Sequence, residues 1–267
     1  PLHDYALSGA TSVSYRHYTL QIPNSDIKIT ETGNFLLKVF EQTPEKPVLT
    51  CRFAVYDSQI PVDAIFKMGH QGSMSNNTHQ IDLQTDISST PLIDVFGDLK
   101  IIIVPNNIWH LAEKSIQPKF VKGNTVFYEV PLNPRNEFRT INLKEMSLNY
   151  SDISEIATIN GIQHVRLALD KIRHFEKQHE KTDMNGRFFI EKYGSWDANL
   201  DADYFYAYFS LQTEQPMLDG NIYVYGSLSN YSFSPSNIMV YNTDKGAYEN
   251  RMLLKQGFYD YCYVHVN

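Results

Sequence analysis

Short strand-like segments separated by turn signals fill the last third of the chain, and this pattern restricts the fold more than any other feature. The segments "DYFYAYFSLQ", "NIYVYG" and "FYDYCYVHV" are rich in aromatic and β-branched residues, which favour strands. Turn signals stand at Asp219-Gly220, Lys245-Gly246 and Gln256-Gly257. Short strands at this spacing predict a β-sandwich of the immunoglobulin-like type.

The sequence patterns of the first two thirds of the chain also predict strands. Residues 15–57 contain strand-like runs interrupted by a Pro-rich connection at 42–47. Residues 80–87 alternate apolar and polar side chains with period two, which predicts a half-buried strand. The run "KIIIV" at 100–104 predicts a fully buried strand, and Gly123-Asn124 predicts the turn of a hairpin.

Two segments need a choice between structures. In residues 159–175, Ile162, Val165 and Leu169 have helical spacing, whereas Val165, Leu167 and Leu169 alternate as in a strand. We predict a strand there, because the neighbouring segments are all strands. In the last strand, the polar residue Asp260 indicates that the opposite face is the buried one, and that face carries Tyr259, Tyr261 and Tyr263.

The junction signals divide the chain into three parts. Ser58-Gln59-Ile60-Pro61 marks one boundary, and the charged run at 173–185 marks another. We therefore predict an all-β protein of tandem immunoglobulin-like or E-set-type β-sandwich domains over residues 1–58, 59–175 and 176–267. Since the sequence opens on Pro1 and not on Met, we expect the first domain to begin upstream of it.

Charge and composition exclude some functions. The net charge of −7 comes without a basic block, so non-specific nucleic-acid binding is set aside. No apolar run is long enough to span a bilayer. The two cysteines, Cys51 and Cys262, fall in different predicted domains, so we expect free thiols over a disulfide, and they do not fix the cellular compartment.

No sequence motif indicates catalysis, a metal or a cofactor. The chain lacks a nucleophile elbow, a zinc-protease motif and a phosphate-binding loop. His174 and His179 lie in the charged run, which we interpret as a solvated linker, with no metal site. Asp197, Asp201 and Asp203 do not have the spacing of a calcium loop and are interpreted as turn residues. We predict no catalytic residues and no cofactor.

Several segments together resemble the type IX secretion system plug proteins of Bacteroidota. The resemblance is carried by "PNSDIKITETGNFLLKVFE", "KPVLTCRFAVYD", "THQIDLQTD", "NEFRTINL" and "DMNGRFFIEK", and most of all by the run from "ADYFYAYFSL" to "GFYDYCYV". It implies a non-catalytic periplasmic protein, exported by a signal peptide and associated with the outer membrane. Its implied partner is the outer-membrane translocon barrel, whose periplasmic opening it closes.

The last section also resembles the glycan-binding sandwich modules of glycogen-branching and debranching enzymes. Gly226-Ser227 and Asn230-Tyr231 stand where those modules have G-S-x-x-N-W, so Tyr231 replaces the sugar-stacking Trp. The one Trp of this section, Trp196, lies outside the matching strands. A carbohydrate-binding protein of the bacterial envelope is therefore the alternative function, with Tyr231, Tyr241 and Lys255 as its candidate residues. A third hypothesis is an accessory region of a hydrolase.

Overall fold

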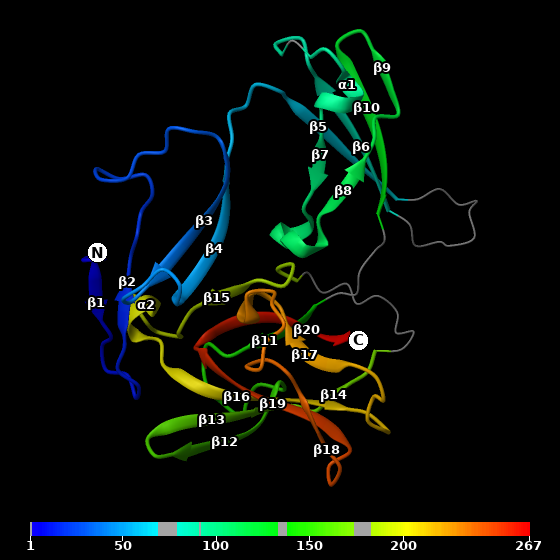
Figure 1. The fold of residues 1–267 in the computed structure, drawn as a ribbon. Coiled ribbons are helices and arrows are strands. Elements are labelled where there is room, and N and C mark those ends of the chain that lie inside the picture. The colour runs from blue at the N-terminus through cyan, green and yellow to red at the C-terminus, as the bar shows by residue number, and fades with distance from the viewer. Residues whose placement is uncertain (1, 69–78, 91, 133–137, 174–182) are drawn as a thin grey trace. The chain divides into compact units, whose positions relative to one another are not determined.

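The computed structural model describes residues 2–68, 79–90, 92–132, 138–173 and 183–267 (Figure 1). Two compact units make up the chain. Pro1–Leu20 and Asn136–Asn267 form one, which we call the sandwich unit, and Gln21–Arg135 form the other, which we call the middle unit. Strands dominate both.

A six-stranded sheet forms one layer of the sandwich unit. Its strand order is β12-β13-β16-β19-β18, and β14 also pairs with β16. Both β13 and β14 run parallel to β16, and the other pairs are antiparallel. The strands are β12 (Ile153–Ile159), β13 (Ile162–Leu167), β14 (Asp170–Lys171), β16 (Tyr204–Gln212), β18 (Val240–Asn242) and β19 (Ala247–Lys255).

The second layer is built around the long last strand, β20 (Gly257–Val266). The first half of β20 pairs with β11 (Arg139–Asn142) and with β15 (Phe188–Ile190). Its second half pairs with β17 (Asn221–Tyr225). All of these pairs are antiparallel.

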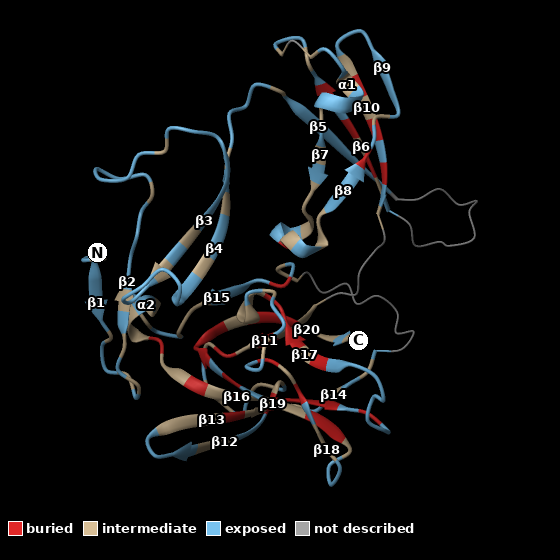
Figure 2. Ribbon diagram, viewed as in Figure 1, coloured by how far each residue is buried: buried red, intermediate tan, exposed pale blue. Residues whose placement is uncertain are grey.

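A single hydrophobic core lies between the two layers. It joins Phe205 and Phe209 of β16 to Val224 of β17 and to Tyr259 and Tyr261 of β20, all of them buried (Figure 2). Each such large side chain stabilises the fold by about 1.5–3 kcal/mol on burial. The predicted all-β fold with sandwich domains is thereby confirmed, and its assignment to the immunoglobulin-like or E-set type stays a prediction.

The sandwich unit has few other elements. A short hairpin joins β1 (Tyr5–Leu7) to β2 (Arg16–Tyr18). Helix α2 (Ala198–Asp201) is capped by the carboxylate of Asp197, which accepts from the Asn199 N–H at 3.0 Å. The 3₁₀ turn η3 spans Ser227–Ser229. Within the described ranges, the helices are all too short and too polar to cross a membrane.

The middle unit contains a four-stranded sheet, two hairpins and three short helical turns. The sheet order is β5-β6-β10-β9, and the hairpins are β3-β4 and β7-β8. Ile101 and Ile103 of β7 pack against the core that β6 and β10 provide. The elements are β3 (Gly33–Phe40), β4 (Pro47–Val55), β5 (Val62–Met68), β6 (His79–Asp86), α1 (Val95–Asp98), β7 (Ile101–Ile103), η1 (Pro105–Asn107), η2 (Trp109–Leu111), β8 (Glu113–Ile116), β9 (Phe120–Lys122) and β10 (Thr125–Leu132).

Most local predictions are confirmed, but the one for residues 100–104 is wrong. Strand β13 occupies the ambiguous segment, and Gly123 lies at the β9-β10 turn with φ +60°. On β6 the predicted apolar face is buried. The run "KIIIV" does not form a fully buried strand, because β7 pairs only with β8 and leaves Ile102 half exposed.

Strands on both sides of residue 175 share the sheets of the sandwich unit. Arg139 of β11 lies opposite Tyr261 of β20, and His164 of β13 lies beside Tyr206 of β16. The sandwich unit therefore takes strands from both sides of the boundary expected near 175.

The last strand buries both of its faces in its first half. Tyr259 and Tyr261 are buried, as predicted, but Asp260 between them is fully buried as well. The carboxylate of Asp260 accepts hydrogen bonds from the backbone N–H groups of Met184 and of Gly186, the latter at 3.2 Å. The expectation that the polar residue marks a solvent face is wrong, because backbone N–H groups of a distant turn donate to one oxygen of the buried carboxylate.

Candidate functional site

The side of the six-stranded sheet that faces away from the core is lined by aromatic and charged residues. On β16, Phe205, Ala207 and Phe209 point into the core, so the alternate residues point outward. The same alternation holds on β13 and β19. We call this surface the outer face, and its outward residues on the three central strands are His164, Arg166, Tyr204, Tyr206, Tyr208, Glu249, Arg251, Leu253 and Lys255.

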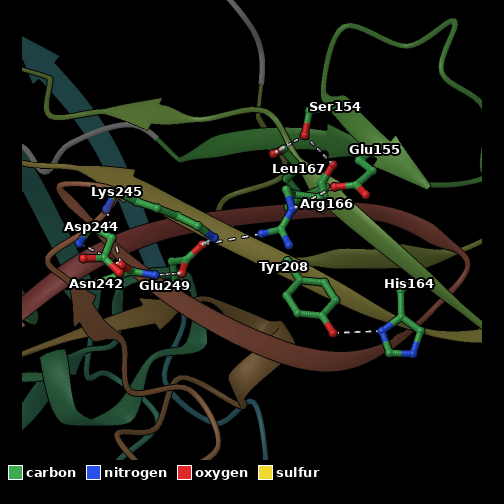
Figure 3. Close-up of polar contacts among 10 residues, drawn as sticks. All are labelled: Ser154, Glu155, His164, Arg166, Leu167, Tyr208, Asn242, Asp244, Lys245 and Glu249. Atoms are coloured by element: carbon green, nitrogen blue, oxygen red, sulfur yellow. Dashed lines mark hydrogen bonds and ion pairs between the residues drawn. The ribbon is translucent and has the colours of Figure 1, made fainter. Parts of the chain in front are cut away.

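Ion pairs run across the outer face from strand to strand (Figure 3). The guanidinium of Arg166 lies 3.2 Å from a carboxylate oxygen of Glu155 on β12 and 3.5 Å from one of Glu249 on β19. Lys245 pairs with the same Glu249 oxygen at 2.7 Å, and Asn242 donates to its other oxygen at 2.8 Å. A network of this kind fixes side chains that would be mobile as isolated surface pairs.

The protonation of Glu249 follows from these contacts. Burial disfavours its charged form, but the hydrogen bonds from Lys245 and Asn242 outweigh burial and lower the pKa of the carboxyl group. Glu249 therefore stays ionised and keeps Arg166 in place at neutral pH.

Aromatic rings lie beneath the arginines. The guanidinium of Arg166 is 5.1 Å from the ring centroid of Tyr208, and that of Arg251 is 4.6 Å from the centroid of Tyr206. His164 bridges the two tyrosines. Its ring centroid lies 5.1 Å from that of Tyr206, and its Nδ1 shares a 2.8 Å hydrogen bond with the Tyr208 hydroxyl (Figure 3). The result is a preorganised surface of Tyr, Arg and His.

The N-terminal segment covers one end of the outer face. Tyr15 contacts the ring of Tyr204 edge-on at 5.2 Å, and Lys255 lies over the Tyr15 ring. The Ser12 hydroxyl donates to Asp203 at 2.9 Å. Burial raises the pKa of Tyr15 to about 12, and burial lowers the pKa of Lys255. This end is a packed contact within the sandwich unit, whereas Arg251 and Leu253 farther along the face are exposed.

The three candidate carbohydrate residues do not come together. Tyr241 of β18 lies opposite Tyr248 of β19. Lys255 is seven residues beyond Tyr248 on β19, which is about 20 Å at the rise of a β-strand. Tyr231 belongs to the other layer, where its ring packs against Tyr225 at 5.6 Å. Lys255 is buried and donates to the Asn199 carbonyl at 2.7 Å.

The other residues considered from the sequence have structural contacts. Asp197 caps α2, Asp201 accepts from the Ser195 hydroxyl at 2.9 Å, and Asp203 accepts from Ser12. His174 and His179 lie outside the described residues. Within the described part of the chain, no three metal-ligating side chains converge. Cys51 and Cys262 are free thiols, and burial raises the pKa of Cys262 to about 12.

One small cavity, of about 250 Å³, opens between β11 and the β13-β14 connection. Two carboxylates line it, those of Asp152 and Asp170, and three side chains contact that of Asp170. Asp170 pairs with Arg139 at 2.8 Å and accepts the hydroxyl groups of Tyr261 and Tyr263 at 2.6 and 2.7 Å. Burial raises the pKa values of both tyrosines well above the ordinary value. This arrangement joins β14 of the six-stranded sheet to β11 and β20 of the second layer.

Sequence reasoning did not identify the outer face, although its signal is present. In "YFYAYF" the tyrosines alternate with the core residues Phe205, Ala207 and Phe209. Periodicity alone does not reveal that His164 and Arg166 lie beside these tyrosines. The two strands are neighbours through a parallel pairing between segments about 40 residues apart.

Comparison with known proteins supports the resemblance seen in the sequence. Residues 1–57 match the family model "Type 9 secretion system plug protein 1st domain". The resemblance to the plug family is confirmed for that part of the chain. A solved structure of a hypothetical protein from Parabacteroides merdae is similar, with a TM-score of 0.92 and 27% identity over 99% of this chain and 68% of that one. No curated protein matches.

Proposed function

We propose that this chain is a non-catalytic periplasmic subunit of the type IX protein secretion system that closes the periplasmic opening of the outer-membrane translocon barrel. The observation that carries the proposal is the match of residues 1–57 to the first domain of the plug proteins. The wider resemblance in sequence, which extends to the last strand, supports the same role for the remainder.

The fold supports such a role in two ways. First, the matched region is not a detached module. Its residues 1–20 belong to the sandwich unit, where Gly9 donates to the Leu200 carbonyl at 2.9 Å and Tyr15 to the Ala202 carbonyl at 2.9 Å. A protein that blocks a pore must resist being pulled apart, and these contacts join residues 1–20 of the matched region to helix α2 and the residue that follows it.

Second, the outer face has the composition of a protein-binding surface. Tyrosine and arginine are enriched at the centres of protein interfaces and among the residues that carry most of the binding energy. Tyr206 and Tyr208 are half-exposed, and the arginines over them are held in place by the ion pairs and ring contacts.

Co-purification from the native host tests the proposal. The full-length protein is tagged at its genomic locus, and the material recovered from detergent-solubilised envelopes is identified by mass spectrometry. We expect the translocon barrel to be recovered in near-stoichiometric amount. A tagged periplasmic protein of similar abundance serves as control. Recovery of the barrel at the level of that control would contradict the proposal.

A further inference from the structure

Four aromatic residues are exposed in one short segment of the sandwich unit. They are Phe188 and Phe189 of β15, and Tyr193 and Trp196 in the connection to α2. Tyr193 is 79% exposed, and Trp196 is fully exposed. Single exposed aromatics are common on protein surfaces, but a group of them marks a contact site, because leaving so much apolar area in water opposes folding.

Tyr193 and Trp196 flank a tight turn. The Ser195 N–H donates to the Lys192 carbonyl at 3.2 Å, and Gly194 has φ +74°, a conformation that favours glycine. The Tyr193 N–H donates to the Lys144 carbonyl at 3.3 Å. The backbone beneath the exposed Tyr193 ring is therefore fixed. We call residues 192–196 the aromatic turn.

Residues at both ends of the aromatic turn form hydrogen bonds with one residue of α2, Asp201. The Ser195 hydroxyl donates to the Asp201 carboxylate at 2.9 Å, and the Lys192 ammonium donates to the Asp201 carbonyl, also at 2.9 Å. Lys192 lies 3.8 Å from the Asp203 carboxylate as well. Preorganisation of this kind lowers the entropy cost of binding, since the turn need not be ordered by its partner.

Trp196 has no packing role in its own unit. It directly precedes Asp197, the N-cap of α2, and an apolar residue at that position often packs on the fourth helical residue. Here the fourth residue is Asp201, which is engaged by Ser195 and Lys192. Within the described residues, the indole N–H of Trp196 has no acceptor. Both its ring and its donor are free for a partner.

The aromatic turn lies beside the outer face. Helix α2 follows the turn directly, and Lys255, at one end of the outer face, donates to the Asn199 carbonyl of α2 at 2.7 Å. The two surfaces are therefore neighbours within the sandwich unit.

We propose that Tyr193 and Trp196 are the anchor residues by which this protein binds the periplasmic side of the translocon barrel, each ring entering an apolar pocket of that protein. This inference rests on the proposed function and adds to it the residues of the contact. Trp and Tyr are the residue types that carry most of the binding energy in protein interfaces, and they do so from positions that are rigid before binding.

The local charge favours a protein partner over a lipid surface. Residues 187–203 contain two basic and four acidic side chains, Arg187, Lys192, Glu191, Asp197, Asp201 and Asp203. Anionic lipid headgroups attract clusters of Lys and Arg, and they repel a segment with this excess of acids. The apolar pocket on the barrel is accordingly expected to have a neutral or basic rim.

The test is the affinity of purified protein for the detergent-solubilised barrel, measured by biolayer interferometry with the barrel immobilised. We expect Trp196→Ala to weaken binding by about tenfold or more, and Tyr193→Ala to weaken it by a smaller factor. Tyr56→Ala, which removes a ring that is 81% exposed in the middle unit, is the matched control and should leave the Kd unchanged. Equal melting temperatures show that the variants fold alike.

The outcomes separate this inference from the proposed function. If wild type binds and Trp196→Ala binds equally well, the anchor assignment is overturned and the plug function stands. If wild type does not bind the barrel, both are overturned. If all three variants lose affinity to the same degree, the effect is not specific to the aromatic turn, and the assignment is again overturned.

A spectroscopic measurement identifies the surface that Trp196 meets. The chain has two tryptophans, so Trp109→Phe leaves Trp196 alone, and 5-fluorotryptophan labelling then gives one ¹⁹F resonance. We expect this resonance to shift or broaden on addition of the unlabelled barrel. It should not move with vesicles of phosphatidylethanolamine and phosphatidylglycerol, or with peptidoglycan fragments. A response to vesicles or glycan alone would overturn the inference in favour of that ligand.

Discussion

Lys255 lies over the ring of Tyr15, with its Nζ 4.2 Å from the ring centroid. Tyr15 belongs to the region that matches the plug first domain, and Lys255 belongs to β19 in the sandwich. The same Tyr15 donates its hydroxyl to the Ala202 carbonyl at 2.9 Å. The contact between Tyr15 and Lys255 joins segments 240 residues apart in the chain.

Removing the Tyr15 ring should destabilise the sandwich unit. Tyr15→Ala loses the edge-on contact with Tyr204, the cation–π contact with Lys255 and the hydroxyl hydrogen bond, which together stabilise folding by about 2–3 kcal/mol. Urea denaturation measures the change. Tyr15→Phe keeps the ring and should lose only about 1 kcal/mol. Equal losses for the two variants would contradict a role for the ring.

Asp260 should make stability depend on pH. Burial raises the pKa of its carboxyl group, although the N–H groups of Met184 and Gly186 oppose the shift, and its Oδ1 has no hydrogen-bond partner among the described residues. A raised pKa means that the native state holds the proton more tightly than the unfolded chain. Its contribution to stability is present below the unfolded pKa near 4 and is lost as the pH rises through the folded value.

Asp260→Asn removes this titration. We expect the free energy of unfolding of the variant, minus that of wild type, to become more positive between pH 4 and pH 7, by about 1.4 kcal/mol for each unit by which the pKa is raised. Exposed Asp219→Asn is the control and should give a constant difference. A difference that falls with pH would mean that the two N–H donors stabilise the carboxylate more than burial opposes it.

Gly226 is required by a close backbone approach. A Cβ atom there would lie 2.7 Å from the Asp260 carbonyl oxygen, and the residue has φ +158°. We expect Gly226→Ala to destabilise the fold by about 2–3 kcal/mol in chemical denaturation. Gly161→Ala is the matched control, since Gly161 also has positive φ but no atom near its Cβ position. It should lose about 1 kcal/mol, and an equal loss at both sites would exclude the steric explanation.

Tyr231 tests the glycan-binding alternative. Its ring packs on Tyr225, and its hydroxyl donates to the Asn185 carbonyl at 3.3 Å, so we assign it a structural role. In affinity electrophoresis on glycogen, starch and peptidoglycan fragments, wild type and Tyr231→Ala should migrate alike. Retardation of wild type that Tyr231→Ala abolishes would favour the carbohydrate function over the structural one.

The local structure could be predicted from the sequence wherever one residue pattern decides it. The alternation in β6, the turn at Gly123 and the aromatic strands of the sandwich follow from periodicity and turn chemistry. The outward-facing tyrosines of β16 follow from the same alternation, because Phe205, Ala207 and Phe209 take the core positions.

What the sequence could not predict depends on partners that are distant in the chain. Arg139 lies opposite Tyr261, and His164 lies beside Tyr206. Both neighbours come from strand pairings that no local sequence pattern specifies. Asp260 is buried because a turn more than 70 residues earlier supplies its donors. The three candidate carbohydrate residues are separated for the same reason, since they fall on different strands and layers of the folded unit.

Ion conductance through the isolated translocon barrel tests the central claim most directly. The barrel is inserted into a planar lipid bilayer, and the current at fixed voltage is recorded before and after the full-length protein is added to the periplasmic side. We predict that the current falls in discrete steps as single pores close, and that protein added to the opposite side has no effect. Currents that stay unchanged at saturating protein from the periplasmic side would contradict the account.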